Sequence, residues 1–358
     1  MRNRHPIVQP LQQEFASMHV SMLASPILPN RGRLSCSVGS QVMKCLVALL
    51  TMFMSSHASF ADEPPAASPK APAPLTAEQK ERLRERDRLA AEANKLFQTG
   101  KLDESLATWK KKLAIERAVY GDDHDDVVQS LQVQAQIFEY GKDDFKAASH
   151  SLEEVLAIQT RRFGPVHWQV GDARRAVSDL QLREKLKPEQ RKLLGQAEQL
   201  NQQAVNQYTH GKYREALALS QKSLQILQDI FGDAHPAYAT SLNNLAMLYQ
   251  AHGDYAKAEP LLRQARDLTK RVLGEAHPDY ATSLNNLASL YQAQGDYAKA
   301  EPLFLQALDL RKRVLGEAHP DYARSLNNLA VLYQAHGDYA KVEPLLRQAL
   351  DLRKRMRG

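Results

Sequence analysis

Residues that could do chemistry are few in this chain, and the most obvious group is an acidic cluster around one histidine, His124. The segment 122–126 reads Asp-Asp-His-Asp-Asp. Carboxylate oxygens and an imidazole nitrogen could hold a cation weakly. Aspartate is also a preferred residue at helix starts, where its side chain accepts hydrogen bonds from backbone N–H groups. We therefore interpret the cluster as a polar loop with N-capping aspartates.

Histidines recur at equivalent places and raise the same question of metal binding. His235, His277 and His319 each precede a proline, and His124 and His167 stand in comparable positions. The ligands of one metal ion must all lie about 2 Å from it. Histidines in successive copies of a repeat should lie too far apart for that. We expect them to be turn or capping residues, with no metal site.

Enzyme motifs do not occur in the sequence. There is no GxSxG, HExxH or GxxxxGK[ST], and no GxGxxG after a strand. The two cysteines, Cys36 and Cys45, both lie near the N-terminus. We therefore expect a non-catalytic protein without a cofactor.

Paired asparagines are the strongest remaining polar signal. They recur every 42 residues as Asn243/Asn244, Asn285/Asn286 and Asn327/Asn328, and Asn201 occupies the first position in a weaker copy. Asparagine is a poor helix former, so six of them would cost about 3–4 kcal/mol relative to alanine. An amide offers both a donor and an acceptor, which suits binding to the main chain of an extended peptide.

The elements that position these asparagines form a 42-residue unit of two helices, most clearly over residues 277–318. Helix A starts at Pro278, where a missing N–H costs nothing, and ends at Gly295. Asp296 caps helix B, and Pro302 lies in its second turn. Apolar residues at helical spacing form the inner faces, namely Leu284, Leu287, Ala288 and Tyr291 on helix A and Tyr297, Ala300, Phe304, Ala307 and Leu308 on helix B.

Repetition of this unit predicts the fold. Four copies occupy residues 189–234, 235–276, 277–318 and 319–358, two divergent copies occupy 77–167, and 168–187 reads as an unpaired helix that breaks the register. One hairpin cannot bury both of its faces, so neighbours must stack. We predict an all-α protein, a right-handed α-solenoid of stacked helix-turn-helix hairpins, with the A helices along its concave wall.

The pattern Leu-x-x-Leu-Ala-x-x-Tyr followed by Gly-x-Tyr-x-x-Ala-x-x-x-Phe-x-x-Ala, over 284–307, resembles the tetratricopeptide repeat. The 42-residue form is similar to the repeats of kinesin light chains and their bacterial relatives. This resemblance implies that the asparagines hold peptide main chain in the concave groove. A long heptad region of the kind that joins kinesin light chains to the motor chain is not found, so a motor-adaptor role is not expected.

Two roles of the asparagines remain open at this stage. They could bind a ligand, or they could bond only to one another, because recent duplication would copy them in either case. The positions where the copies differ are the better candidates for selectivity: Met247, Ser289 and Val331 at one position, and Arg324 in place of Thr282 at another. Arg324 could meet a ligand carboxylate or be a solvated arginine.

The N-terminal residues 1–61 read as an extension followed by a signal peptide. Lys44, an apolar run over about 45–56 and the small residues Ser59 and Ala61 predict cleavage after Ala61. Met43 would then be a natural start, and a basic transit peptide is the rival interpretation. Five basic residues and one acidic residue would be lost, reducing the net charge from +6 to +2. Nucleic acid is therefore not an expected partner, and the apolar run is too short for a stable membrane span.

A proline-rich linker is expected over 62–76, before the repeats. Taken together, the sequence predicts a scaffold or adaptor, exported to the periplasm or the extracellular space, that binds a protein or extended peptide in its groove. The alternative is a structural module that self-assembles as a dimer or filament. Gly358 directly follows helix B of the last repeat, and terminal repeats usually need a polar cap.

Overall fold

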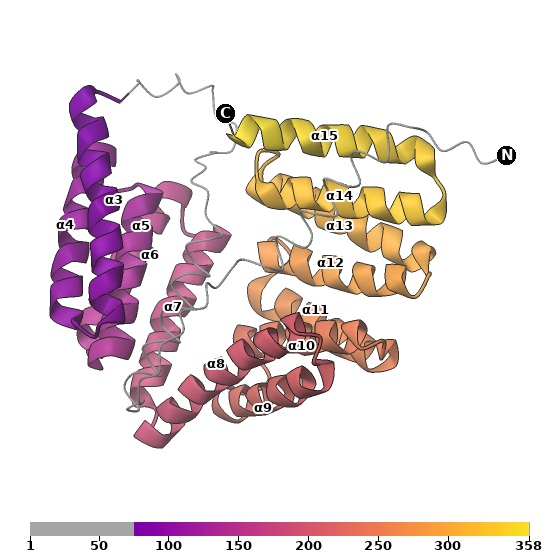
Figure 1. The fold of residues 1–358 in the computed structure, drawn as a ribbon, viewed down its shortest axis with the longest axis horizontal. Helices are drawn as coiled ribbons and strands as arrows, with labels where there is room; N and C mark the ends of the chain where they lie inside the picture. The colour runs from indigo at the N-terminus through magenta and orange to yellow at the C-terminus, as the bar shows by residue number, and fades with distance from the viewer. Residues whose placement is uncertain (1–74, 358) are drawn as a thin grey trace. The chain divides into compact units, whose positions relative to one another are not determined.

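The computed structural model describes residues 75–357, which are helical almost throughout (Figure 1). The predicted signal peptide and nearly all of the predicted linker lie outside the described residues. Two compact units are present, one ending at Gly195 and the other beginning at Gln196, and their boundary falls within a single helix, α8 (Pro188–Thr209).

The N-terminal unit contains two helical hairpins and one further helix. Its elements are α3 (Ala77–Gln98), α4 (Leu102–Tyr120), α5 (Asp125–Gln136) continued by the π-helix η1 (Ile137–Gly141), α6 (Phe145–Phe163) and α7 (Trp168–Lys185). Helix α7 packs on α6 through Ala173 and Leu180, which are both buried. It occupies the position that the first helix of a next hairpin would take.

The C-terminal unit is a stack of antiparallel hairpins (Figure 1). After α8 come α9 (Tyr213–Phe231), α10 (Pro236–Ala251), α11 (Tyr255–Leu273), α12 (Pro278–Ala293), α13 (Tyr297–Leu315), α14 (Pro320–His336) and α15 (Tyr339–Arg357). From α9 to α15, consecutive helices pack on one another. The stacked hairpins confirm the predicted all-α repeat fold.

The core of the C-terminal unit is formed by the apolar residues whose helical spacing in the sequence predicted burial. Leu287, Ala288, Tyr291, Ala300 and Phe304 are all buried in one cluster that spans three hairpins. Small residues at Ala288 and Ala300 allow the close approach of the helices. The turn between α12 and α13 uses Gly295 at φ 78°, a left-handed backbone that favours glycine.

Histidines precede five of the helices, α5, α7, α10, α12 and α14, and cap them as predicted. The Nδ1 atoms of His235, His277 and His319 each accept a hydrogen bond from the backbone N–H two residues on, at 3.1 Å. His124 and His167 do the same for α5 and α7. The proline that follows in the C-terminal repeats has no N–H to satisfy. These side chains therefore act as N-caps.

Candidate functional site

The asparagine pairs lie between neighbouring first helices of the C-terminal unit and hydrogen-bond to one another. Asn286 Nδ2 of α12 donates to Asn243 Oδ1 of α10 at 3.4 Å. Asn328 Nδ2 of α14 donates to Asn285 Oδ1 of α12 at 2.7 Å. In these two repeats the second asparagine thus reaches back to the first asparagine of the preceding repeat. We call this series the asparagine ladder.

The amides do bond between repeats, as the structural role of the asparagines requires. Each bond uses one donor and one acceptor, so part of the amide groups remains for a ligand. Asn244, at the start of the series, is exposed, whereas Asn285 and Asn286 are half-buried. Asn201, on α8, is half-buried at the equivalent position.

At the other end of the ladder, Asn327 Oδ1 is buried and has no hydrogen-bond partner among the described residues. The two ladder bonds described above show which atom would donate to this oxygen. It would be the Nδ2 of an asparagine on a further first helix, stacked on α14. This oxygen is therefore an acceptor that the ladder itself leaves unused.

An apolar row runs beside the ladder on the same helices. Met247 and Val331, at equivalent positions of α10 and α14, are 47% and 49% exposed. Ser289 stands between them on α12, and its hydroxyl donates to Asn285 O at 2.9 Å. Val205, on α8, is 44% exposed and belongs to the same row by the 42-residue spacing. The sequence interpretation missed Val205 although this spacing identifies it.

Two arginines lie near the apolar row, one on α14 and one on α13. Arg324 is exposed and pairs with Asp321 of its own helix at 2.9 Å. Arg311, near the end of α13, is buried, and its burial lowers its pKa to about 10. Its neighbours Lys312 and Arg313 do lie at the surface, paired with Glu317 and Asp309. The difference follows from helix geometry, because Arg311 alone points toward α12 and α14.

The aspartates of the acidic cluster in the N-terminal unit are all paired with arginines. Asp123 pairs with Arg161 at 2.6 Å, and Asp125 pairs with Arg162. Asp126 pairs with Arg86 at 2.8 Å and Asp122 with Arg117 at 3.4 Å. The prediction that aspartates cap this helix is wrong, because His124 is the N-cap and the aspartates serve as partners of arginines. No group of metal-ligating residues occurs within 75–357.

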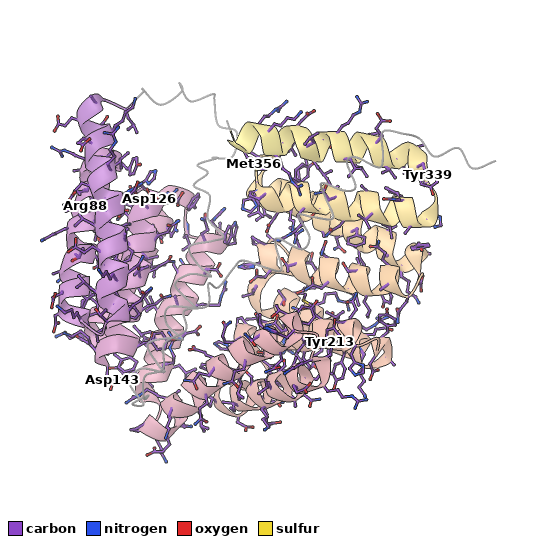
Figure 2. The ribbon with its side chains drawn as sticks, in the orientation of Figure 1. Arg88, Asp126, Asp143, Tyr213, Tyr339 and Met356 are labelled. Atoms are coloured by element: carbon purple, nitrogen blue, oxygen red, sulfur yellow. The ribbon has the colours of Figure 1, made fainter. Side chains whose placement is uncertain are left out.

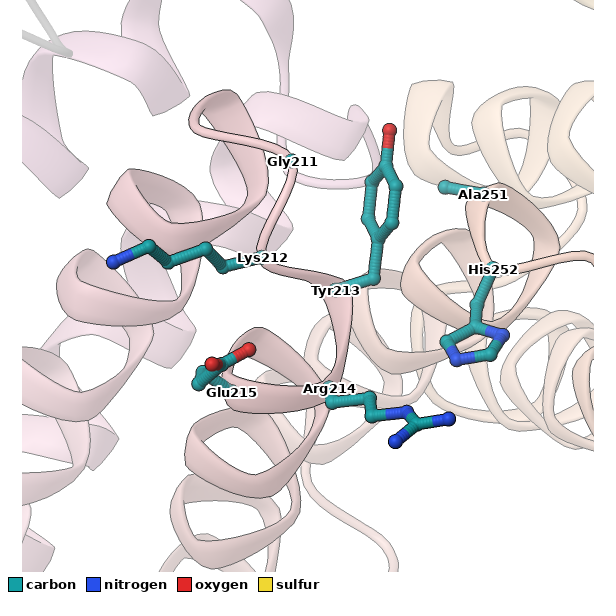
Figure 3. Close-up of a pocket in the computed structure, with 7 residues that line it drawn as sticks. All are labelled: Gly211, Lys212, Tyr213, Arg214, Glu215, Ala251 and His252. Atoms are coloured by element: carbon teal, nitrogen blue, oxygen red, sulfur yellow. The ribbon is translucent and has the colours of Figure 1, made fainter.

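A surface cavity of about 400 Å³ lies apart from the predicted site residues (Figure 3). It is lined by Gly211, Lys212, Tyr213, Arg214, Glu215, Ala251 and His252, at the start of α9 and the end of α10. Lys212 replaces the capping aspartate of the later repeats and makes no side-chain cap. Across the described part of the chain, no helix has the length and apolar character that crossing a membrane requires.

The comparison with protein families gives matches that coincide with the repeats. The family model described as tetratricopeptide repeat matches residues 92–161, 195–271, 249–313 and 279–355. A search of curated proteins gave no match.

Solved structures with a similar fold include BtubC (BKLC) from P. vanneervenii, which is 21% identical over 72% of this chain and 92% of its own, with a TM-score of 0.41. A putative kinesin light chain with nearly identical TPR-like repeats, from Podosopora anserina, is 20% identical over 78% of this chain and 98% of its own, with a TM-score of 0.32. Pseudomonas aeruginosa pilF is 17% identical over 74% of this chain and 90% of its own, with a TM-score of 0.30.

Proposed function

This chain belongs to the tetratricopeptide repeat family, and from that premise we propose that it is an exported, non-catalytic scaffold whose C-terminal unit binds an extended peptide or protein segment. The binding surface is the face of α10, α12 and α14 that carries the asparagine ladder and the apolar row. Export rests on the signal-peptide pattern before Ala61.

The observation that carries this proposal is the exposure of Met247 and Val331. Large apolar side chains gain from leaving water, and most other large apolar residues of these repeats are buried. An exposed apolar row with amides beside it offers a ligand both contact area and main-chain hydrogen bonds. Neighbouring packed helices are about 8–10 Å apart, which is about three residues of an extended peptide.

The test removes the apolar row without touching the ladder. Met247→Ser and Val331→Ser together introduce the residue that the chain itself has at position 289. Leu305→Ser is the matched control, because Leu305 is 43% exposed but belongs to α13, a second helix. Immobilised residues 62–358 would be used to capture ligands from the envelope fraction of the source cells. A partner retained by wild type and the control but lost by the double variant supports the proposal, and equal capture by all three contradicts it.

A second candidate function, self-assembly, is favoured by two features of the hairpin formed by α14 and α15. Tyr339 is 65% exposed at the start of α15 (Figure 2), whereas its equivalents Tyr255 and Tyr297 pack against the core. The unused acceptor Asn327 Oδ1 lies on the preceding helix. Light scattering of residues 62–358 tests this function, since assembly requires a mass that rises with concentration. A constant monomer mass at high micromolar concentration argues against it.

A further inference from the structure

Arg311 is a buried cation without an acidic partner. Its side chain is 1% exposed. Its Nη1 donates to Ser325 Oγ at 2.7 Å and to Asp321 O at 3.4 Å, and its Nη2 donates to Thr282 Oγ1 at 3.3 Å. The Nε atom is buried and has no partner, and Asp321, the acid whose charge favours the cation, offers Arg311 its backbone oxygen. Neutral oxygens satisfy some of the donors but do not balance the charge.

The same chain contains a matched site that lacks this charge. One repeat earlier, Thr269 stands in place of Arg311, and Ser283 Oγ donates to its Oγ1 at 3.3 Å. Thr282 likewise stands in place of Arg324. We call the packing of one first helix on the next a step. At the positions equivalent to 311, 321 and 324, the step between α10 and α12 has one acidic residue, Asp279, and no basic residue. The step between α12 and α14 has two bases, and its only acid is Asp321.

The extra positive charge lies beneath the proposed binding surface. Arg324, Asn328 and Val331 follow one another at i, i+4 and i+7, so they share the exposed face of α14. Thr282, which accepts from Arg311, is half-buried on α12. A charge held in a poorly hydrated position is weakly screened and acts over a longer distance than a surface charge. Arg311 thus raises the electrostatic potential at the exposed surface around Arg324.

We propose that the step between α12 and α14 is a position for a ligand carboxylate, the side chain of a glutamate or aspartate in an extended peptide. The carboxylate contacts Arg324, while Arg311 supplies charge from beneath without direct contact. The step between α10 and α12 has no such preference. This inference rests on the proposed function, because it assigns a side-chain class to one position of the same surface.

The experiment compares two fluorescein-labelled peptides, (Val-Ser-Glu)4 and (Val-Ser-Gln)4, by fluorescence anisotropy with residues 62–358. Their three-residue period matches the spacing of the first helices, so one register places valines on the apolar row and a glutamate at Arg324. We expect wild type to bind the glutamate peptide about tenfold more tightly than the glutamine peptide.

Three variants identify the source of this preference. Arg311→Thr, which restores the residue of the preceding repeat, should reduce the preference about fivefold although the exposed contacts remain. Arg324→Thr should reduce it at least as much. Arg353→Thr is the control, because position 353 is equivalent to 311 in the last repeat and the substitution changes net charge equally. Circular dichroism checks folding, and Arg311→Gln replaces Arg311→Thr if that variant is unfolded.

Each outcome bears on the inference. A preference that is lost in the Arg311 and Arg324 variants and kept in the Arg353 variant supports it. Equal binding of both peptides to wild type overturns the inference and leaves the proposed function standing. Equal loss in all three variants also overturns it, since net charge alone would then explain the preference. Failure of both peptides to bind would contradict the proposed function as well.

Discussion

At the scale of single residues, the asparagine ladder combines two opposing effects of similar size. Two asparagines in a helix cost about 1–1.4 kcal/mol relative to alanine. One inter-repeat hydrogen bond contributes about 0.5–1.5 kcal/mol in return. The ladder therefore adds little net stability. Its distinct effect is geometric, because bonds such as that from Asn328 to Asn285 fix how neighbouring first helices are aligned.

The two asparagines Asn328 and Asn244 should respond differently to alanine. Asn328→Ala removes the 2.7 Å ladder bond and leaves Asn285 Oδ1 without its donor, so we expect a loss of about 0.5–1 kcal/mol after the gain in helix propensity. Asn244 is exposed, so Asn244→Ala should stabilise the protein by about 0.5 kcal/mol. Urea unfolding followed by circular dichroism measures both changes. Equal effects of the two substitutions would contradict a structural role for the ladder.

At the scale of elements, the N-terminal unit uses a buried ion pair to attach its last helix. Glu139 lies in η1, and its carboxylate accepts from Arg183 of α7, with Oε1 2.5 Å from Nε and Oε2 3.1 Å from Nη2. Burial raises the pKa of Glu139 despite this partner. The pair therefore positions α7 against η1, while desolvation offsets much of its electrostatic stabilisation.

Arg183→Leu should destabilise the N-terminal unit by about 3 kcal/mol at pH 7, because a buried carboxylate is left unpaired. A raised folded-state pKa of Glu139 means that this loss is present above that pKa and is relieved as the pH falls through it toward the unfolded value. Replacing both residues by leucine should cost less than the single change. Urea unfolding at pH 5 and pH 7, followed by tryptophan fluorescence, tests both statements. A double variant less stable than Arg183→Leu would contradict this account.

The elements also show how far sequence could predict this molecule. Repeated apolar spacing predicted the buried positions of α12 and α13, since period and burial are directly coupled. The same reasoning had no signal for η1 or for Asp143, whose φ of 53° follows it. It also could not assign the partners of Asn286 or the burial of Arg311, because both depend on packing between repeats. Such contacts follow from three-dimensional neighbours and leave no periodic trace in one chain.

At the scale of the whole molecule, the two units differ in the size of their largest buried apolar cluster and in their buried carboxylates. In the C-terminal unit, one buried cluster joins residues from α10 to α15, including Leu262, Phe304 and Val342. Smaller separate clusters occur in both units, but the described residues of the N-terminal unit form no cluster as large, and two carboxylates, Glu116 and Glu139, are buried there. Burial raises the pKa of both, which indicates that their charged forms are held at a cost. We therefore expect the N-terminal unit to be the less stable.

The positions of the tryptophans allow this expectation to be tested in the intact chain. The sequence has only two, Trp109 and Trp168, and both lie in the N-terminal unit. Tryptophan fluorescence therefore reports on that unit alone, whereas far-ultraviolet circular dichroism reports on all helices. In urea, the fluorescence transition should come first, and a second loss of helix signal should follow at higher concentration. Coincident transitions would instead mean that α8, which is continuous across the boundary, couples the two units into one cooperative structure.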